Sequence, residues 1–418
     1  MTRTGAGRTA PPRPTMAIMP LATPDVRRHN LGLVLGRVLE GAGEARADIA
    51  GATGLSRGAV TSLVAELIDA GLVEESDVVA PAGMGRPRTA LTLAAAAPCV
   101  LIGLLDADHA TAVAGTLAGE ELARTSRSHG RPMGDPAAIV GVLADALDDV
   151  AGRMAAAGRR IADVCVVVWA PVGGTPVRVL ADTDLAWGEV DLLGLLRTRS
   201  TALAAFERAG GEPRLVSDAE VAALAEHAAV GGDTLLYLKA DSGIGGAVVL
   251  AAGDDSGARV LPAALGHLPV VPDGVRCACG QHGCLVTVAG PDVLLARSGL
   301  GALAADEGLT VALEAFVTQV RTGDESAASV WRGAAREIAR TLQIVALTVA
   351  PDVIVLGGFV AALAADVDEM FRAIQPRIAH APVLPVAPVL GSTLGADAAL
   401  RGAQRDARLR LLADPLAI

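Results

Sequence analysis

The chain has 418 residues, enough for two or three domains, and 52% of them are hydrophobic, so it can bury a large core. Its formal net charge of −11 excludes a protein coated over its whole surface with nucleic acid. The charge is uneven, because the first 93 residues hold ten Arg against nine acidic residues and the acidic excess lies in the remainder. This asymmetry is typical of a DNA-contacting N-terminal unit joined to an acidic body.

The first 22 residues are rich in Pro, Thr, Gly and Arg and contain no apolar run long enough for a signal peptide. We predict a disordered tail over residues 1–22. The most apolar later stretch, 342–362, is interrupted by Pro351 and Asp352, which argues against a membrane span. We therefore expect a cytoplasmic protein with no membrane partner.

Residues 23–93 predict a small helical domain. Asn30 is placed to cap a first helix, Arg46–Ala52 forms a second, and Ser56 caps a third that ends at Gly71. Apolar residues recur at helical spacing in the first and third helices: Leu31, Val34, Leu35, Val38 and Leu39, then Val60, Leu63, Val64, Leu67 and Ile68. Two short helices joined across the glycine-containing turn Thr53–Leu55 predict a helix-turn-helix.

A wing is predicted after the third helix, where Leu72–Val73 and 90–93 can pair around a loop containing Gly83–Arg88. An Arg-Pro-Arg sequence can follow phosphates or enter a minor groove, and the start of the third helix is where such helices meet base edges. The candidate DNA-binding residues are Arg27, Arg28, Ser56, Arg57, Thr61, Ser62, Arg86 and Arg88. A module that binds protein is the alternative, but arginines at both edges favour a double-stranded DNA operator, read by a homodimer.

From residue 94 to residue 418 the pattern changes to strands alternating with helices. Buried strands are predicted at 99–105, 110–117, 165–174, 234–240, 244–250 and 352–358, with a helix from Pro136 to Gly158. Glycine turns follow several of these strands, as in Asp241–Gly246. We predict an α/β body whose turns lie where phosphate and sugar usually bind.

A metal site is predicted at residues 267–284. His267, Cys277, Cys279 and Cys284 bring one imidazole and three of the five cysteines into eighteen residues. A Cys3His set fills the tetrahedral coordination of structural zinc with protein ligands alone. A disulfide or plain buried cysteines are the alternatives, and nothing in the sequence points to an oxidising compartment. His282 lies inside the cluster and competes with His267 as a ligand, although its position favours exposure.

The motifs together resemble the ROK family of repressors, open reading frames and kinases. The winged helix, the turn Asp241–Gly246, the sequence Leu265-Gly266-His267 with its three following cysteines, and the Leu356-Gly357-Gly358 sequence occur in the family's order. The resemblance covers nearly everything after residue 23. It implies an actin-like, ribonuclease H-like, two-lobed sugar-kinase body. With a fused winged helix it implies a regulator, usually a repressor, of carbohydrate genes that forms homodimers or homotetramers.

The phosphate-binding turns depart from the family pattern. The family's D-x-G-G-T turn corresponds to 103–109, where the glycine pair is missing and Asp106 and Asp108 occupy the turn. The family's G-T-G-I-G-x-G turn begins here with Asp241. Carboxylates at Asp108 and Asp241 would repel a triphosphate at close range, so the sequence predicts that ATP is not used and that the chain is not an enzyme.

The sugar site is also altered relative to the family. Asp218 matches the family's catalytic base, here vestigial, within Ser217–Glu220, but Ala264 and Val286 replace two glutamates that hold sugar hydroxyls. A role for Asp218 as an ordinary helix N-cap is equally open. The resemblance gives Asp184, Ser217, Asp218 and His267 as candidate effector-binding residues.

Two functions follow from these observations. The first is a DNA-binding regulator whose degenerate kinase-like body senses an effector or partner and mediates oligomerisation. A sugar effector is what the family implies, while the altered site leaves a non-sugar ligand or none open. The alternative is a ROK sugar kinase that phosphorylates a hexose with ATP.

Overall fold

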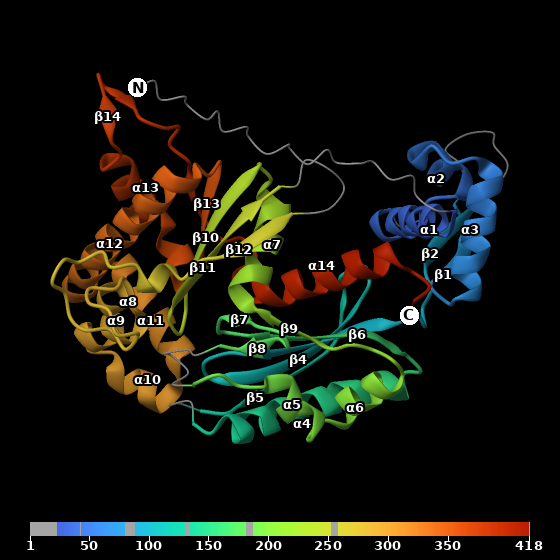
Figure 1. Cartoon of the computed structure of the whole chain (residues 1–418), viewed down its shortest axis with the longest axis horizontal. Helices are drawn as coiled ribbons and strands as arrows, with labels where there is room; N and C mark the ends of the chain where they lie inside the picture. The colour runs from blue at the N-terminus through green and yellow to red at the C-terminus, as the bar shows by residue number, and fades with distance from the viewer. Residues whose placement is uncertain are drawn as a thin grey trace, which may run out of the picture.

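The structure is a computed structural model that describes residues 23–41, 43–79, 88–130, 134–180, 187–251 and 258–417. It has a head, Thr23–Leu93, and a body of two lobes, with the head beside the C-terminal helix (Figure 1). The predicted tail 1–22 lies outside the described residues. Among the residues that are described, no helix is both long enough and apolar enough to cross a membrane.

The head contains three helices and a two-stranded sheet. They are α1 (Thr23–Glu40), α2 (Arg46–Thr53), α3 (Arg57–Asp69), β1 (Val73–Val79) and β2 (Arg88–Leu93). The predicted apolar faces of α1 and α3 are buried against each other, and Val73 pairs with Leu93 in the antiparallel sheet. Ser56 accepts a hydrogen bond from the backbone N–H of Ala59, as an N-cap does, and Gly71 is left-handed with φ of 71°.

The prediction that Asn30 caps the first helix is wrong, because α1 begins seven residues earlier at Thr23. The first two turns of α1 are mostly exposed and therefore show no apolar periodicity in the sequence. Asn30 lies inside the helix, where the buried face begins with Leu31.

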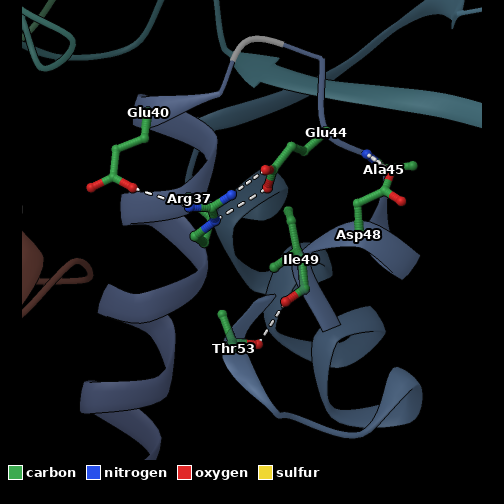
Figure 2. Close-up of polar contacts among 7 residues, drawn as sticks. All are labelled: Arg37, Glu40, Glu44, Ala45, Asp48, Ile49 and Thr53. Atoms are coloured by element: carbon green, nitrogen blue, oxygen red, sulfur yellow. Dashed lines mark hydrogen bonds and ion pairs between the residues drawn. The ribbon is translucent and has the colours of Figure 1, made fainter. Parts of the chain in front are cut away.

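Polar contacts fix the connection between α1 and α2 (Figure 2). Arg37 of α1 donates to the carboxylate of Glu44 in the connecting loop and lies 3.3 Å from Glu40. Asp48 accepts a hydrogen bond from the backbone N–H of Ala45 at 3.2 Å, which caps the start of α2. The backbone of Glu44 also pairs with Leu91 of β2, so the loop is tied to the sheet.

The first lobe is built on a five-stranded sheet in the order β5-β4-β3-β6-β9. Its strands are β3 (Cys99–Leu105), β4 (His109–Thr116), β5 (Glu121–Ser128), β6 (Ile161–Val168) and β9 (Arg214–Ser217). The helices that accompany it are α4 (Pro136–Ala156), α5 (Leu192–Arg197) and α6 (Thr201–Arg208), and a small sheet pairs β7 (Val172–Gly173) with β8 (Arg178–Val179). Because α4 packs on β3 and β4, one face of the sheet is covered by helix and β3 is buried along its whole length.

The second lobe has a five-stranded sheet in the order β12-β11-β10-β13-β16. Its strands are β10 (Thr234–Ala240), β11 (Ile244–Leu250), β12 (Arg259–Pro262), β13 (Val353–Gly358) and β16 (Val389–Gly391). Its helices are α8 (Val286–Ala289), α9 (Pro291–Arg297), α10 (Gly301–Glu307), α11 (Leu309–Thr322), α12 (Glu325–Val349) and α13 (Ala364–Ala373), with 3-10 turns η1 (Leu265–His267), η2 (Phe359–Leu363) and η3 (Gly395–Asp397). A separate hairpin pairs β14 (Arg377–Ile378) with β15 (Ala381–Pro382).

Two helices, α7 (Asp218–Val230) and α14 (Ala398–Ala413), join the parts of the molecule. α7 packs on β10 and β11 of the second lobe, and α14 packs on α7, on β3 and β6 of the first lobe and on α1 of the head. In Figure 1, α14 runs as a single red helix from the body toward the head. One buried apolar cluster therefore contains residues of the head and of both lobes.

Candidate functional site

A cavity of about 330 Å³ lies where the ends of β6, β9, β10 and η1 meet. It is lined by Ser217 and Asp218 at the start of α7, by His267 at the end of η1, and by Trp169 directly after β6. Cavities of this size with a few converging polar groups commonly hold small molecules. The structure thus brings together three of the four predicted effector residues, while Asp184 lies outside the described part of the chain.

Lys239 of β10 is the central charged group of this cavity. Its Nζ lies 2.6 Å from Asp218 Oδ2, 2.9 Å from Asp241 Oδ2 and 3.7 Å from the centre of the Trp169 ring. Its side chain is only 13% exposed. Burial opposes the charged ammonium, but the two carboxylates outweigh this and raise the pKa of Lys239 above its ordinary value. Burial raises the pKa of Asp241 despite the opposing attraction of Lys239.

Sequence reasoning missed Lys239 and Trp169 as site residues. The available signal was that the chain's one lysine stands inside an otherwise apolar strand, directly before a glycine turn. A charged residue at such a position needs a partner, because an unpaired buried charge is strongly unfavourable. The partner Asp218 comes from a different strand–helix connection, so spacing along the chain could not identify it.

The alternative reading of Asp218 as a helix N-cap is wrong. The N-cap position of α7 is Ser217, and Asp218 is the first helical residue. Its carboxylate accepts a hydrogen bond from Lys239 across to the neighbouring strand. Asp218 therefore connects the start of α7 to β10, in addition to lying in the favourable field of the helix N-terminus.

A second cavity, of about 730 Å³, lies between the two lobes and is lined by Asp106, Tyr237, Thr310, Gly358 and Ser392, among others. Trp169, Lys239 and Asp241 line both cavities, so they form the partition between them.

The carboxylates in the two turns are satisfied within the protein. Asp106 Oδ1 accepts backbone N–H groups of Asp108 and His109 at 3.0 and 2.8 Å. Asp108 is buried, and its Oδ2 accepts the backbone N–H of Leu309 at the start of α11 at 2.8 Å. The prediction that Asp108 and Asp241 would repel a triphosphate treated both carboxylates as free charges. In the structure Asp108 caps the start of α11 and Asp241 pairs with Lys239.

The predicted metal ligands converge on one point. The ligand atoms of His267, Cys277, Cys279 and Cys284 all lie within 4.8 Å of one another. Cys279 Sγ is 3.6 Å from Cys284 Sγ, which excludes a disulfide between them, and Cys277 Sγ is 3.7 Å from His267 Nδ1. His282 is exposed and does not belong to the cluster. The cluster can bind a metal ion, and His267 joins it to the cavity, which the same residue lines.

The backbone of this loop supports the cluster. Cys277 N donates to Gln281 O at 2.7 Å, and Gly280 N donates to Cys277 O at 2.9 Å, which folds the thiols toward each other. Gly283 is left-handed with φ of 69°, and a side chain there would overlap the carbonyl of Val271. A hydrogen bond from the backbone N–H of Gln281 is the main cause that lowers the pKa of Cys279 to about 7, which favours the thiolate that metals bind.

The predicted DNA-contacting residues divide into three groups. Ser56, Arg57, Thr61 and Ser62 are all exposed at the start of α3, and no ion pair with Arg57 occurs among the described residues. Arg27 instead pairs with Glu66 of α3, and Arg28 pairs with Asp414 of the body at 3.1 Å. Arg86 and the side chain of Arg88 lie outside the described residues.

Comparison with known proteins places this geometry in a family. The pattern described as the ROK family matches residues 105–408, which is more than half of the chain. The chain belongs to the ROK family. Kanosamine kinase of Amycolatopsis mediterranei is 32% identical over 269 residues, which cover 62% of this chain and 82% of that kinase. N-acetylmannosamine kinase of Escherichia coli is 30% identical over 175 residues, and this ROK chain matches 57% of its length.

Solved structures of the ROK fold extend the comparison. A ROK family transcriptional regulator, a homologue of the E. coli MLC protein, superposes with a TM-score of 0.68 at 22% identity and covers 94% of this chain and 98% of its own. The ROK hexokinase of Thermus thermophilus has a TM-score of 0.53 at 26% identity and covers 75% of this chain and 99% of its own. The body therefore has the two-lobed α/β fold of ROK sugar kinases, as predicted.

The prediction that the chain is not an enzyme is contradicted by these relatives. Two of the curated proteins that it resembles are named kanosamine kinase and N-acetylmannosamine kinase. The physical reason for the error lies in the turns, where the prediction counted Asp108 and Asp241 as free charges. In the structure Asp108 accepts the backbone N–H of Leu309, Asp241 pairs with Lys239, and Asp218 lies at the cavity.

Proposed function

We propose that this chain is a DNA-binding transcriptional regulator, with residues 23–93 as a winged helix-turn-helix and 94–418 as a ligand-sensing body. The observation that carries the proposal is the head, three helices followed by a two-stranded antiparallel sheet. The structural likeness to a ROK regulator covers 94% of this chain, more than the body alone could supply, whereas the likeness to the ROK hexokinase covers 75% of it, which supports the proposal. We expect it to act as a repressor of genes for carbohydrate metabolism.

The start of α3 has the properties of a recognition helix. Ser56 holds its first turn, the apolar side of α3 is buried in the head, and Arg57, Thr61 and Ser62 face solvent. Their guanidinium and hydroxyl groups are the types that bind base edges and phosphates. Because helix-turn-helix proteins commonly read two half-sites with two-fold symmetry, we expect a homodimer, or a homotetramer made of two dimers, on a palindromic operator.

The cavity beside Lys239 is the proposed effector site. Ser217, Asp218 and His267 offer a hydroxyl, a carboxylate and an imidazole, which together can bind a polyhydroxylated ligand such as a sugar. A ligand hydroxyl that donates to Asp218 must share that carboxylate with the ammonium of Lys239. This competition ties ligand binding to the position of the first turn of α7.

The Cys3His cluster is proposed to hold a structural zinc ion. A tetrahedral ion with Zn–S bonds of about 2.3 Å separates its sulfur ligands by about 3.8 Å, close to the 3.6 Å between Cys279 and Cys284. All four positions would be filled by protein, so the ion would stabilise the loop and would not activate water. Since His267 is both a ligand and a cavity residue, the ion would also fix one wall of the effector site.

Selection from a pool of random duplexes tests the proposed function. The full chain is expected to enrich a palindromic sequence, and Arg57→Ala should lose that enrichment. Arg332→Ala is the matched control, because Arg332 is an exposed arginine on α12 of the body, away from the head. If the wild-type chain enriches no sequence, the proposal fails; if both variants enrich the wild-type sequence equally, Arg57 has no part in the DNA contact.

A second candidate function is phosphoryl transfer from ATP to a sugar or amino sugar. It is favoured by the names of the curated relatives and by Asp218, which lies at the cavity as the family's base does. The test is ATP consumption with kanosamine, N-acetylmannosamine and glucose. Turnover that Asp218→Asn abolishes would support this function, and lack of turnover on all three would leave these substrates without support.

A further inference from the structure

The cavity and the head are joined by two tightly packed helices. The first turn of α7 lines the cavity through Asp218, Ala219 and Glu220. One residue further, the backbone of Val221 contacts α14 at Gly402, where an added methyl group would overlap the Val221 carbonyl oxygen. Four of the buried residues of α7 are alanines, and those of α14 are mostly alanine with Gly402, so small side chains let the two backbones approach closely.

Ion pairs hold α14 against the first lobe along its second half. Asp163 of β6 accepts from Arg214 at 3.0 Å and also pairs with Arg410 of α14, and Arg214 pairs in addition with Asp406. Asp163 is buried, with its side chain 6% exposed, and buried pairs of this kind are costly to break. They fix the path of α14 between the lobes and the head.

At its C-terminal end α14 packs on α1 of the head as closely as it packs on α7 at Gly402. A methyl group added at Gly32 of α1 would overlap the backbone carbonyl of Leu412, next to the last residue of α14. Beside this contact Arg28 of α1 pairs with Asp414. The buried cluster of the head includes Leu31 and Leu35 together with Ala403 and Ala407 of α14, so the contact is part of one core.

We propose that α14 couples the effector cavity to the DNA-binding head, with Gly402 and Gly32 as its two positioning residues. This inference rests on the proposed function, which assigns effector binding to the cavity and DNA binding to the head. A ligand that draws Asp218 away from Lys239 moves the first turn of α7, and the Gly402 contact passes that movement to α14. The Gly32 contact then changes the seat of α1, and with it the presentation of α3 to DNA.

Hydrogen exchange of backbone amides tests the coupling without DNA or a known ligand. Gly402→Ala alters only the body, yet it should speed exchange in α1 and α3 by about tenfold, while exchange in α4 and α12 stays within about twofold of wild type. Gly32→Ala should have the same effect on α1. The matched controls are Gly36→Ala, one turn along α1, where an added methyl meets only Leu412 side-chain carbons at 4.0 Å, and Gly333→Ala in α12, where it meets nothing within 4 Å.

The coupling is overturned if α1 exchanges at the wild-type rate in Gly402→Ala, or if α4 and α12 accelerate as much as α1, which would indicate general destabilisation. Should Gly402→Ala fail to fold, Asp414→Asn removes the partner of Arg28 from the body side and should speed exchange in α1 about threefold. Unchanged exchange in α1 would then count against the coupling. If Gly402→Ala speeds exchange in α1 but the wild-type chain binds no DNA, the proposed function is refuted while the coupling stands.

Discussion

The two lobes of the body have the same topology but differ in how they satisfy an acidic turn. In the first sheet β5, β4 and β3 are antiparallel neighbours, and β6 and β9 continue the sheet from β3 as parallel strands. In the second sheet β12, β11 and β10 are antiparallel neighbours, and β13 and β16 continue it in parallel. The turn after β3 holds Asp106 and Asp108, and both accept backbone N–H groups. The turn after β10 holds Asp241, which pairs with the ammonium of Lys239.

This difference shows that the charge of a turn cannot be judged from its own residues. The carboxylates of the first turn stabilise local and inter-lobe backbone, whereas the carboxylate of the second turn belongs to an ion-pair group with Lys239 and Asp218. Both arrangements reduce the negative potential that a ligand phosphate would meet. Variants that remove one partner at a time can separate the two arrangements.

The largest effect is expected from the metal cluster, which lies in the second lobe. Replacing Cys279 with Ser should abolish zinc binding and unfold the loop 267–284, because structural zinc supplies on the order of 10–16 kcal/mol of apparent binding free energy in small domains. Zinc content per chain and amide exchange in the loop are the measurements. Exchange in β3 and β4 of the first lobe should change little.

His282→Ala is the control in the same loop, since His282 is exposed and outside the cluster. It should retain about one zinc per chain. Wild-type protein prepared without chelators that contains no zinc would refute the metal assignment.

The next effect is expected at Lys239. Lys239→Met leaves Asp218 and Asp241 without their shared cation in a buried site, which should lower the free energy of unfolding by about 3–5 kcal/mol. Denaturant unfolding measures it. Arg197→Met serves as control, because its ion pair with Glu207 lies on the surface and should contribute less than about 1 kcal/mol. An equal loss of unfolding free energy in the two variants would contradict the claim that the buried ion pairs of Lys239 stabilise the fold more than a surface pair does.

A smaller loss is expected in the first turn. Asp108→Ala removes a buried hydrogen bond to Leu309 N that joins the lobes, and should cost about 1–3 kcal/mol of unfolding free energy with faster exchange at the start of α11. Asp135→Ala is the comparison, because Asp135 caps α4 at an exposed site within one lobe. If α11 exchanges at its wild-type rate in Asp108→Ala, the contact between the lobes is not held by this carboxylate.

The smallest predicted effect is a pH dependence at Glu226 of α7, which pairs with Ser392 beyond β16. Burial raises the pKa of Glu226, so the folded chain binds this proton more tightly than the unfolded chain. The stabilisation contributed by the protonated Glu226 carboxyl is fully present below the pKa of the unfolded chain, and it is lost as the pH rises through the pKa of the folded chain. The stability of Glu226→Gln relative to wild type should therefore increase as the pH rises from acidic to neutral. Melting temperatures test this, and a difference that stays as constant as that of the exposed-site variant Glu369→Gln would contradict it.

The sequence predicted those features whose evidence is local. Ser56 and Gly71 mark the ends of α3 because caps depend on nearby backbone, and the metal cluster was predicted because its four ligands lie within eighteen residues. Several buried strands of the body, such as β3, β10 and β13, and the helix α4 also followed from periodicity along the chain. The start of α1 was not predicted, because its exposed first turns carry no apolar pattern.

Contacts between distant segments could not be predicted. Asp108 meets Leu309 from 201 positions away, and Asp218 meets Lys239 from a neighbouring strand. Arg28 was likewise predicted from the sequence to contact DNA, whereas in the structure it pairs with Asp414. Each of these residues is charged, and the partner that decides its role comes from tertiary packing.

The measurement that tests the central proposal most directly is the salt dependence of binding to a selected duplex, for wild type, Arg57→Ala and Arg332→Ala. Each phosphate contact adds about one to the slope of log affinity against log salt concentration. We predict that Arg57→Ala binds more weakly than wild type with a slope smaller by about one per chain, while Arg332→Ala matches wild type. Identical affinity and slope for all three proteins, or no binding by the wild-type chain, would contradict a DNA-binding role for the head.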